Sequence, residues 1–427
     1  MKRLIFLSVH NLRLNPFGEL ALPGLSRRGW AIDVVGVGAK SSVTGRVLPY
    51  ACQRFDIPPL NLGRLAFESR LFRWLQHART GPFDVIYIHS SALASRAALG
   101  LAGPLFGKRL VYHAHDFFDP LDHPVHAWLE KRLTRRAACH FNGEFHRAFV
   151  CQTLYGFRAP ILIVPPHLPS AWPVPAPSPE IRRKLGASSP DDVVLILHGG
   201  WSRLRATREL LEAMALLPPR FRLVMTTDPS PPLQAATARL GIEGRVVCIG
   251  RQSYEDLFQY TSSSDIGILL HANNDLGNFF QAPGRLTEYL ASGIPVLASH
   301  FTGLQLLTLK HGVGLCADPG SPQDITERLL DLEAGRRDGR FSRSVIRQRF
   351  LDVFAFDHWE DTVCRAFDEV LDSSPLPSRP VRPILSAIGG PLYVPSLPAI
   401  SWGVHSTKAQ QPSAQESAEL ESKAGDL

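Results

Sequence analysis

The feature that most constrains the fold is an alternation of short apolar segments with longer amphipathic ones, which recurs in both halves of the 427-residue chain. A short apolar run between turn residues is typical of a buried strand, and apolar residues spaced three and four apart are typical of a helix. Strands that alternate with helices predict a parallel sheet covered by helices on both faces. We therefore expect an α/β protein with two doubly wound parallel-sheet domains.

In the first half, this pattern predicts strands at residues 4–9, 32–37, 85–89 and 110–113, and helices at 20–28, 64–78, 92–101 and 125–138. In the second half, it predicts strands at 193–197, 222–226, 246–249, 266–270 and 296–299, and helices at 205–216, 232–240, 254–262 and 285–292. Ligands of doubly wound sheets bind at the carboxyl ends of the strands, so the loops that follow these strands are the candidate sites.

A stiff, proline-rich stretch between Pro165 and Pro179 separates the two halves. We expect an N-terminal domain at residues 1–168, a linker at 169–190, a second domain at 191–350 and a terminal amphipathic helix within 351–373. Residues 374–427 are rich in Pro, Ser, Ala and Gln without periodicity, and we expect them to be disordered.

Charge and cysteine content narrow the classes of function. Residues 1–170 hold 21 lysines and arginines against 10 aspartates and glutamates, although the whole chain has a net charge of only +7. This excess suits nucleic acid or an anionic membrane surface, but no nucleic-acid-binding signature accompanies it, so we expect no nucleic-acid partner. No uncharged apolar stretch reaches 18 residues, so no membrane span is expected. The six scattered cysteines favour reduced thiols in the cytoplasm and no structural metal.

The stretch from Gln281 to His300 reads as a loop, a short helix and a buried strand. Leu286, Tyr289 and Leu290 are spaced as one buried helical face, and Gly293 suits the left-handed residue that closes a helix. The N–H groups at the start of such a helix form a ready anion site.

Glu288 lies in the first turn of this predicted helix. Its carboxylate could accept hydrogen bonds from both hydroxyls of a diol such as ribose. The alternative is an exposed glutamate that the helix dipole stabilises.

A second candidate loop follows the first strand of the second half and reads His-Gly-Gly-Trp-Ser-Arg-Leu-Arg from His198. Gly200 permits close approach of the backbone to a ligand, and Arg203 and Arg205 can neutralise a diphosphate. The alternative is that both arginines are solvated. Cations at a helix start oppose the helix dipole, which favours an anionic partner.

Two loops of the first half are also candidates. Gly18 precedes a predicted helix, where it serves either a ligand or a plain turn. His115 and Asp116 lie in a run of histidines and aspartates after the fourth strand. A metal site is one interpretation of that run, but its spacing does not match a zinc helix, and we expect no metal.

Two basic segments of the first half can be interpreted in two ways. Residues 64–79 interleave arginines with leucine, phenylalanine and tryptophan, and residues 131–136 read Lys-Arg-Leu-Thr-Arg-Arg. Such a helix either covers the sheet with its arginines in water or lies in a membrane interface. Peripheral contact with an anionic membrane therefore stays open as an interpretation.

The run from Pro283 to Ser299 resembles the donor-site motif of retaining glycosyltransferases of the GT-B fold, of the family 4 (group 1) type. The family often has another glutamate where this chain has Phe280. The resemblance covers about residues 1–372 and implies two Rossmann-like domains that face a cleft, with the terminal helix crossing back to the first domain. The donor-binding residues that it implies are Gly18, Gly200, Arg203, Arg205, Gly250, Arg251, Pro283, Gly284, Arg285, Leu286 and Glu288. It also implies that the catalytic residues His115 and Asp116 lie near the transferred sugar.

The function implied by this resemblance is transfer of a hexose, with retention, from a UDP- or GDP-sugar to a glycan or lipid-linked acceptor. Biosynthesis of cell-surface polysaccharide or lipopolysaccharide is the expected setting, in the cytoplasm or at the inner face of its membrane, without a cofactor. Three alternatives stay open: a nucleotide-sugar 2-epimerase, a non-catalytic relative that acts as an assembly partner, and a nucleic-acid-binding protein.

Overall fold

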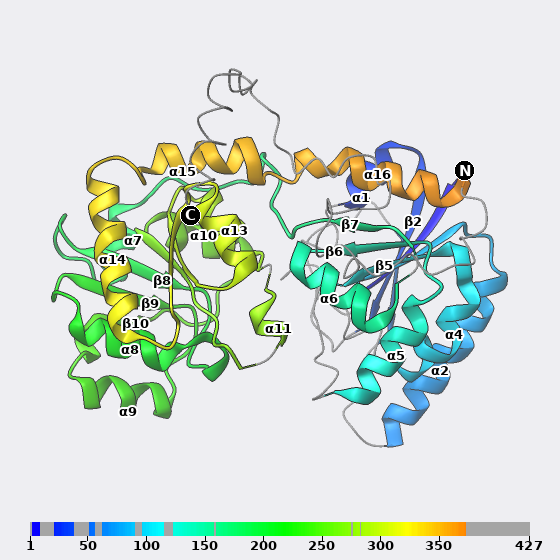
Figure 1. The fold of residues 1–427 in the computed structure, drawn as a ribbon, viewed down its shortest axis with the longest axis horizontal. Helices are drawn as coiled ribbons and strands as arrows, with labels where there is room; N and C mark the ends of the chain where they lie inside the picture. Colours follow the sequence, from blue (N-terminus) through cyan, green and yellow to red (C-terminus); the bar gives the residue numbers. More distant parts are fainter. Residues whose placement is uncertain are drawn as a thin grey trace, which may run out of the picture.

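The computed structural model describes residues 2–8, 21–37, 51–55, 62–89, 96–114, 123–157, 159–274, 276–281 and 283–372. Within these ranges the chain forms two α/β domains that lie side by side, each built on a parallel sheet (Figure 1). No helix in this described part is long and apolar enough to cross a membrane. The predicted tail at 374–427 lies outside the described residues.

In the described part of the first domain, a seven-stranded parallel sheet has the order β3 (Ala51–Phe55), β2 (Trp30–Val37), β1 (Lys2–Ser8), β4 (Val85–His89), β5 (Leu110–Ala114), β6 (Cys139–Asn142) and β7 (Ile161–Ile163). Its helices are α1 (Ala21–Arg27), α2 (Leu62–Thr80), α4 (Ala97–Ala102), the 3-10 helix η2 (Gly103–Arg109), α5 (Pro124–Thr134) and α6 (Phe145–Tyr155). The order reverses direction at β1 and β4, which is where a doubly wound sheet binds its ligand.

The second domain repeats this arrangement with six described strands in the order β10 (Val246–Cys248), β9 (Phe221–Met225), β8 (Val193–Leu197), β11 (Ile266–Leu269), β12 (Val296–Ser299) and β13 (Gly314–Ala317). Its longer helices are α7 (Pro179–Lys184), α8 (Thr207–Leu216), α9 (Pro231–Leu240), α10 (Tyr254–Ser262), α12 (Arg285–Ala291), α13 (Thr302–Leu309), α14 (Pro322–Arg337) and α15 (Arg343–Arg349). Its short elements are η3 (Arg203–Arg205), η4 (Glu243–Arg245), α11 (Leu276–Phe279) and the π-helical turn η5 (Phe350–Phe354). The reversal lies between β8 and β11.

Helices cover both faces of the first sheet. The side chains of β1 alternate: Leu4 and Phe6 join one buried cluster and Ile5 and Leu7 the other. The first cluster includes α1, and the second includes α2, α4, α5 and α6. This alternation follows from the two-residue period of a strand and explains why β1 is apolar from Leu4 to Leu7.

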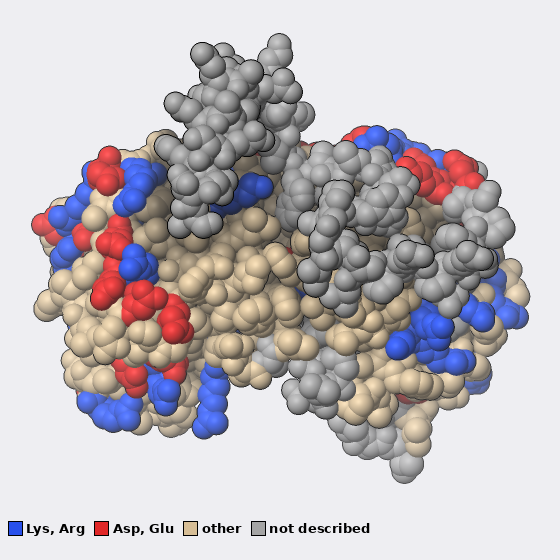
Figure 2. All heavy atoms as spheres, viewed as in Figure 1, with Lys and Arg blue, Asp and Glu red and all other residues tan. Residues whose placement is uncertain are grey.

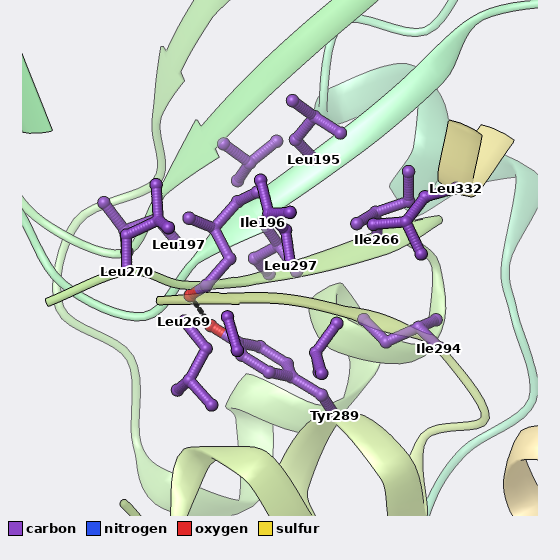
Figure 3. Close-up of a cluster of buried hydrophobic side chains, with 14 of the residues drawn as sticks. Leu195, Ile196, Leu197, Ile266, Leu269, Leu270, Tyr289, Ile294, Leu297 and Leu332 are labelled. Carbon is purple, nitrogen blue, oxygen red and sulfur yellow. Dashed lines mark hydrogen bonds between the residues drawn. The ribbon is translucent and has the colours of Figure 1, made fainter. Parts of the chain in front are cut away.

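The second sheet encloses a larger core in which Tyr289 of α12 reaches among the leucines and isoleucines of β8, β11 and β12 (Figure 3). Its hydroxyl donates to the carbonyl of Ile268 at 3.2 Å. Gly267 makes this possible, because a Cβ there would lie 2.4 Å from the tyrosine ring. The core thereby fixes the position of α12 against the sheet edge.

The chain returns to the first domain after the second is complete. Helix α16 (Asp357–Asp372) buries Val363, Cys364 and Phe367 in the same cluster as Leu4 and Phe6. The side chain of Asp368 accepts from Lys2 at 2.7 Å, at the first strand of the chain. The two domains are therefore joined by two crossings of the chain.

The two-domain parallel α/β fold is confirmed, and the predicted helix 254–262 matches α10. Sequence patterning missed β3, β6, β7 and β13. Strands β3, β6 and β13 contain polar residues or glycine, and β7 is only three residues long. The expected linker contains α7, which begins after Ser178 caps its N-terminus. Helix α2 covers the sheet with Phe67, Leu71 and Leu75, as one of the two interpretations of that basic segment required.

Candidate functional site

Polar side chains gather at the carboxyl edge of the second sheet, where the strand order reverses between β8 and β11. His198 directly follows β8, His271 follows β11, and Glu288 lies in the first turn of α12. The hydroxyl of Tyr289 accepts a hydrogen bond from the backbone N–H of His198 at 3.0 Å. Three loops are thus held together at the place where this fold class binds ligands.

Glu288 is the centre of a buried hydrogen-bond network. Its side chain is not the exposed carboxylate of the alternative interpretation, because the residue is only 4% exposed. One carboxylate oxygen accepts from the hydroxyl of Tyr254 at 3.0 Å, and the other accepts from Nδ1 of His198 at 2.8 Å. Each carboxylate oxygen can accept a further hydrogen bond, so Glu288 keeps acceptor capacity for a ligand hydroxyl.

His198 is held by contacts on both ring nitrogens. Its Nε2 lies 2.9 Å from the hydroxyl oxygen of Thr261. Burial lowers the pKa of His198, and the nearby cations Arg285 and Arg205 lower it further against the opposing effect of Glu288. The imidazole is therefore neutral at physiological pH, and it donates from Nδ1 because the carboxylate can only accept.

Two arginines converge on one backbone carbonyl beside this network. Nη1 of Arg205 donates to the carbonyl of His198 at 2.7 Å, and Nη1 of Arg285 donates to the same oxygen at 3.2 Å. Gly199 leaves the space for this contact, since a Cβ there would lie 2.9 Å from the Arg205 guanidinium. Arg285 also contacts Nε2 of His271 at 3.2 Å.

These two guanidinium groups have no carboxylate within ion-pair distance in the described part of the chain. Burial lowers the pKa of Arg285 to about 10, and the charge of Arg205 adds to this effect. Both groups therefore stay cationic at neutral pH and repel each other. Like charges placed side by side, both of them half buried, indicate that an anion completes the site.

The turn that carries Arg205 contains a strained residue. Ala206 follows η3 and has φ of +46°, which is unusual for a residue other than glycine. Arg203 is exposed, and it lines a cleft of about 880 Å³ together with Trp201, Ala272 and Phe279. The turn thus directs Arg203 into the cleft and Arg205 into the buried network.

Gly250 and Arg251 lie at the end of β10, two strands from β8. Neighbouring strands are about 4.8 Å apart, so the end of β10 is roughly 10 Å from the end of β8 along the same edge. Gly250 has φ of +70°, and Arg251 is exposed. The separation suits the distance between the base and the diphosphate of a nucleotide.

The start of α12 differs in one respect from the sequence-based expectation. The N–H of Leu286 donates to Pro283, and those of Thr287 and Glu288 donate to Gly284, so the N–H groups at this helix start are largely used by its own turn. The side chain of Leu286 is 1% exposed and belongs to the core, and the donor-binding role of this residue stays a prediction. Positive charge at this edge therefore comes from Arg205 and Arg285.

The expected site residues of the first domain, Gly18, His115 and Asp116, lie outside the described residues. The described edge of that sheet holds His113 of β5, whose Nδ1 lies 2.7 Å from the hydroxyl of Tyr87. Histidine and aromatic rings pack closely here, with 4.7 Å between the ring centroids of His89 and His113. In the part of the chain that the structure describes, no group of three or more potential ligands could hold a metal ion.

Sequence reasoning missed His198, Tyr254 and His271 as members of the site. Nothing in the local pattern marks them, because Tyr254 begins an ordinary helix and both histidines follow ordinary strands. Their partners lie far away in sequence: His198 and Glu288 are 90 residues apart. Only the order of the strands brings these residues together.

Comparison with known families gives two matches that together span most of the described chain. Residues 21–167 match the model described as glycosyl transferase 4-like domain, and residues 192–334 match the model described as glycosyl transferases group 1. No curated protein sequence matches the chain.

Several solved structures share the fold at low sequence identity. Sucrose-phosphate synthase from Thermosynechococcus elongatus has a TM-score of 0.69 at 15% identity, over 88% of this chain and 100% of that one. HepE from Anabaena, in complex with UDP and glucose, has a TM-score of 0.67 at 19% identity, over 86% and 100%. WaaG, a glycosyltransferase involved in lipopolysaccharide biosynthesis, has a TM-score of 0.59 at 17% identity, over 86% and 98%.

The family models agree with the paired Rossmann-like domains, and the structural matches extend across both of them. The chain belongs to the group 1, family 4-like glycosyltransferases of the GT-B fold, which use nucleotide-sugar donors.

Proposed function

We propose that this protein transfers a hexose from a UDP- or GDP-sugar to a glycan or lipid-linked acceptor, with retention of the anomeric configuration. The observation that carries the proposal is the pair of guanidinium groups, Arg205 and Arg285, that meet at the carbonyl of His198 without a carboxylate partner. A diphosphate is an anion of the right size and charge to complete such a site.

In this proposal the second domain holds the donor. Arg205 and Arg285 stabilise the charge that develops on the leaving diphosphate, with Arg203 reaching it from the cleft. Glu288 accepts hydrogen bonds from the ribose hydroxyls, and Gly250 and Arg251 frame the base. Pro283 and Gly284 shape the turn against which the diphosphate rests. The arginines supply the positive charge that the leaving group needs, so the proposal requires no cofactor.

The first domain binds the acceptor in this scheme, with Gly18, His115 and Asp116 near the transferred sugar. Support for the acceptor class comes from two structural neighbours, WaaG and the lipopolysaccharide outer core galactosyltransferase WaaB, although both are distant in sequence. A lipid-linked acceptor places the reaction at the inner face of the cytoplasmic membrane, so peripheral contact with an anionic membrane belongs to the proposal.

The first test is thermal stabilisation of the protein by UDP, GDP and their sugars. A ligand at 100 times its dissociation constant adds about 2.7 kcal/mol to the free energy of unfolding. We expect one nucleotide diphosphate to stabilise the wild type and to lose this effect in Glu288→Gln. The matched control is Glu255→Gln, an exposed glutamate of α10, which should respond as the wild type does.

Product analysis with the nucleotide sugar so identified then tests the reaction. Transfer to an added acceptor with the anomeric configuration kept supports the proposal, and a changed donor sugar without acceptor would assign an epimerase instead. Binding without any turnover would move the protein to the non-catalytic relatives, and no response to any nucleotide would reject the donor site itself.

A further inference from the structure

A pocket of about 270 Å³ lies where the two domains meet. Its walls come from the starts of α6 and α16, from α13 and η5, and from the chain segment that follows β7. Helices α6 and α13 lie on the facing sides of the two domains (Figure 1). We call this cavity the junction pocket; the lining residues that matter most here are Phe145, His167, Leu307, Lys310, Phe354 and Trp359. None of its lining residues belongs to the candidate donor site, so it is a separate cavity.

The interior of the junction pocket is apolar and rich in aromatic rings. Phe145, Phe354 and Trp359 line it together with leucines of α13. A cavity of roughly 150 Å³ with an apolar lining holds a benzene molecule, so this pocket has room for one ring with substituents. On the face shown in Figure 2, charged side chains gather on the outer parts of both domains, and few lie where the domains meet. Aromatic rings pack favourably on one another, so the pocket suits an aromatic ligand.

His167 supplies an unused hydrogen-bond acceptor among these apolar side chains. The residue is only 4% exposed, and its ring centroid lies 4.8 Å from that of Trp359. Burial lowers the pKa of His167 to about 3, although a hydrogen bond to the backbone carbonyl of Phe354 opposes the shift. The imidazole is therefore neutral, with one nitrogen that donates and one that accepts. Its Nδ1 has no hydrogen-bond partner in the described part of the chain, and buried polar atoms normally have one. A hydroxyl group of a ligand can supply the missing donor.

The rim of the pocket is positively charged. Lys310 and His311 follow the last turn of α13 and line the pocket. Among the described lysines, Lys2 and Lys184 form ion pairs, so Lys310 has no carboxylate partner in that part of the chain. Burial lowers the pKa of His311, and the charges of Lys310 and Arg349 lower it further, which places a second cation near the rim. No aspartate or glutamate is among the described residues that line the pocket. The rim therefore suits an anionic group such as a carboxylate.

Hydrogen bonds hold the walls of the pocket in place without a ligand. The carbonyl of Pro166, next to His167, accepts from the hydroxyl of Thr287 at 3.3 Å. The carbonyl of Leu168 accepts from the backbone N–H of Phe356 at 2.8 Å, which ties the segment after β7 to the chain between η5 and α16. The pocket is thus largely preformed, as binding sites for small molecules usually are.

We propose that the junction pocket binds a small aromatic carboxylate that carries a hydroxyl group. Its ring packs against Phe354 and Trp359, its hydroxyl donates to Nδ1 of His167, and its carboxylate meets Lys310 at the rim. Such a ligand contacts both domains at once and holds them in the arrangement that the structure shows. This binding does not depend on the proposed reaction, because the pocket shares no residue with the donor site.

The test measures binding of 4-hydroxybenzoate to the purified protein by isothermal titration calorimetry. We expect saturable binding of one molecule per chain. Benzoate lacks the hydroxyl group and should bind about fivefold more weakly, because one hydrogen bond is lost. Phenol lacks the carboxylate and should bind about tenfold more weakly or less still, because hydrogen bonds to charged groups are the stronger ones.

Variants of the lining residues locate the binding site. Leu307→Trp should fill the pocket and abolish binding, whereas Leu309→Trp, at an exposed position of the same helix, should keep wild-type affinity. Lys310→Gln should weaken binding of 4-hydroxybenzoate and of benzoate by about tenfold and leave phenol unaffected. Its matched control is Lys184→Gln, a lysine of α7 that is paired with Glu180. His167→Phe should lower the affinity for 4-hydroxybenzoate to that for benzoate.

A further variant separates this pocket from the cationic donor site. Arg205→Gln/Arg285→Gln should bind 4-hydroxybenzoate as the wild type does. Loss of binding in that variant together with full binding by Leu307→Trp would assign the ligand to the donor site and overturn the proposal. No saturable binding to the wild type, or equal affinity for benzoate and 4-hydroxybenzoate, would also overturn it. The unfolding temperature of each variant identifies a folding defect, and Lys310 is exposed, so Lys310→Gln tests the pocket even where Leu307→Trp is unstable.

Discussion

The carboxyl edges of the two sheets carry histidines in opposite surroundings, although the strand order reverses at the same point in both. At the first edge, His89 and His113 pack against each other and against the rings of Phe6 and Tyr87. At the second edge, His198 and His271 lie among Arg205, Arg285 and Glu288. The same backbone scaffold thus supports an aromatic edge in one domain and a charged edge in the other.

The difference shows where binding energy for an anion resides. Charged groups that are half buried and unpaired cost free energy in the empty protein, which a charged ligand recovers on binding. The described part of the first edge has no such unpaired charged groups, because its histidine rings are packed among aromatic neighbours. The following changes test this contrast, beginning with the largest expected effect.

Replacement of Arg205 and Arg285 by neutral residues should abolish anion binding at the carboxyl edge of the second sheet. We expect Arg205→Gln/Arg285→Gln to bind the nucleotide diphosphate at least about 100-fold more weakly, because each hydrogen bond to a charged group contributes roughly 1.5–3 kcal/mol. Isothermal titration calorimetry measures the change. Two controls should retain wild-type affinity: Arg208→Gln, an exposed arginine paired with Glu209, and Tyr87→Phe at the first edge. Affinity of the double variant within threefold of the wild type would refute the assignment.

Buried neutral histidine in the first domain should make stability depend on pH. Burial lowers the pKa of His140 to about 3, and its ring stacks on Phe157 with 3.9 Å between the ring centroids. The unfolded chain, with a pKa near 6.5, therefore binds one more proton between these values, and stability falls as pH falls through this window. The loss contributed by His140 should reach about 2 kcal/mol at pH 5.

His140→Phe should remove this contribution and flatten the dependence of unfolding free energy on pH below 6.5. Urea unfolding at a series of pH values from 7 to 5 measures the slope. A variant whose slope equals that of the wild type would show that His140 is not a neutral buried group. Burial also lowers the pKa of His198 in the second domain, but its carboxylate partner Glu288 opposes that shift. The charged surroundings of the second edge therefore also act on its buried histidine.

The smallest expected effect concerns backbone strain. In the described part of the chain, Ala206 at the second edge is the one residue other than glycine that has a left-handed backbone. Ala206→Gly should raise the free energy of unfolding by about 1 kcal/mol, because the left-handed conformation is costly for alanine and not for glycine. Ala213→Gly, in the interior of α8, should lower it by about 1 kcal/mol or more. If both substitutions changed the free energy of unfolding in the same direction, the turn would not be strained.

The fold was largely predictable because its central strands are apolar on both faces and leave a strong pattern. Every residue of β8 is buried, and so is every residue of β4. Strand β6 reads Cys-His-Phe-Asn and β13 begins with glycine, so neither has a periodic signal. Their pairing with neighbouring strands decides their conformation, and that information lies outside the strands themselves.

The candidate site was predictable where residue type and local position suffice. Arg205, Arg285 and Glu288 stand in loops or helix starts next to predicted strand ends, and the structure brings them to one sheet edge. The buried partners of Glu288 were not predictable, since a tyrosine at the start of α10 is an ordinary core residue by pattern. Leu286 lies on the core face, as its spacing with Leu290 predicted, and its contact with the donor stays a prediction.

The return of α16 to the first sheet has a consequence for the order in which the protein is made. Phe367 packs against Tyr87 and Phe141 with ring centroids 5.2 Å and 5.6 Å apart, so part of the core of the first domain is supplied by its most distant helix. The ribosome must complete the whole second domain before this helix emerges. Until then the apolar sheet face around Phe6 is covered by α1 but not by α16, so the domain that is synthesised first is the one that finishes folding last.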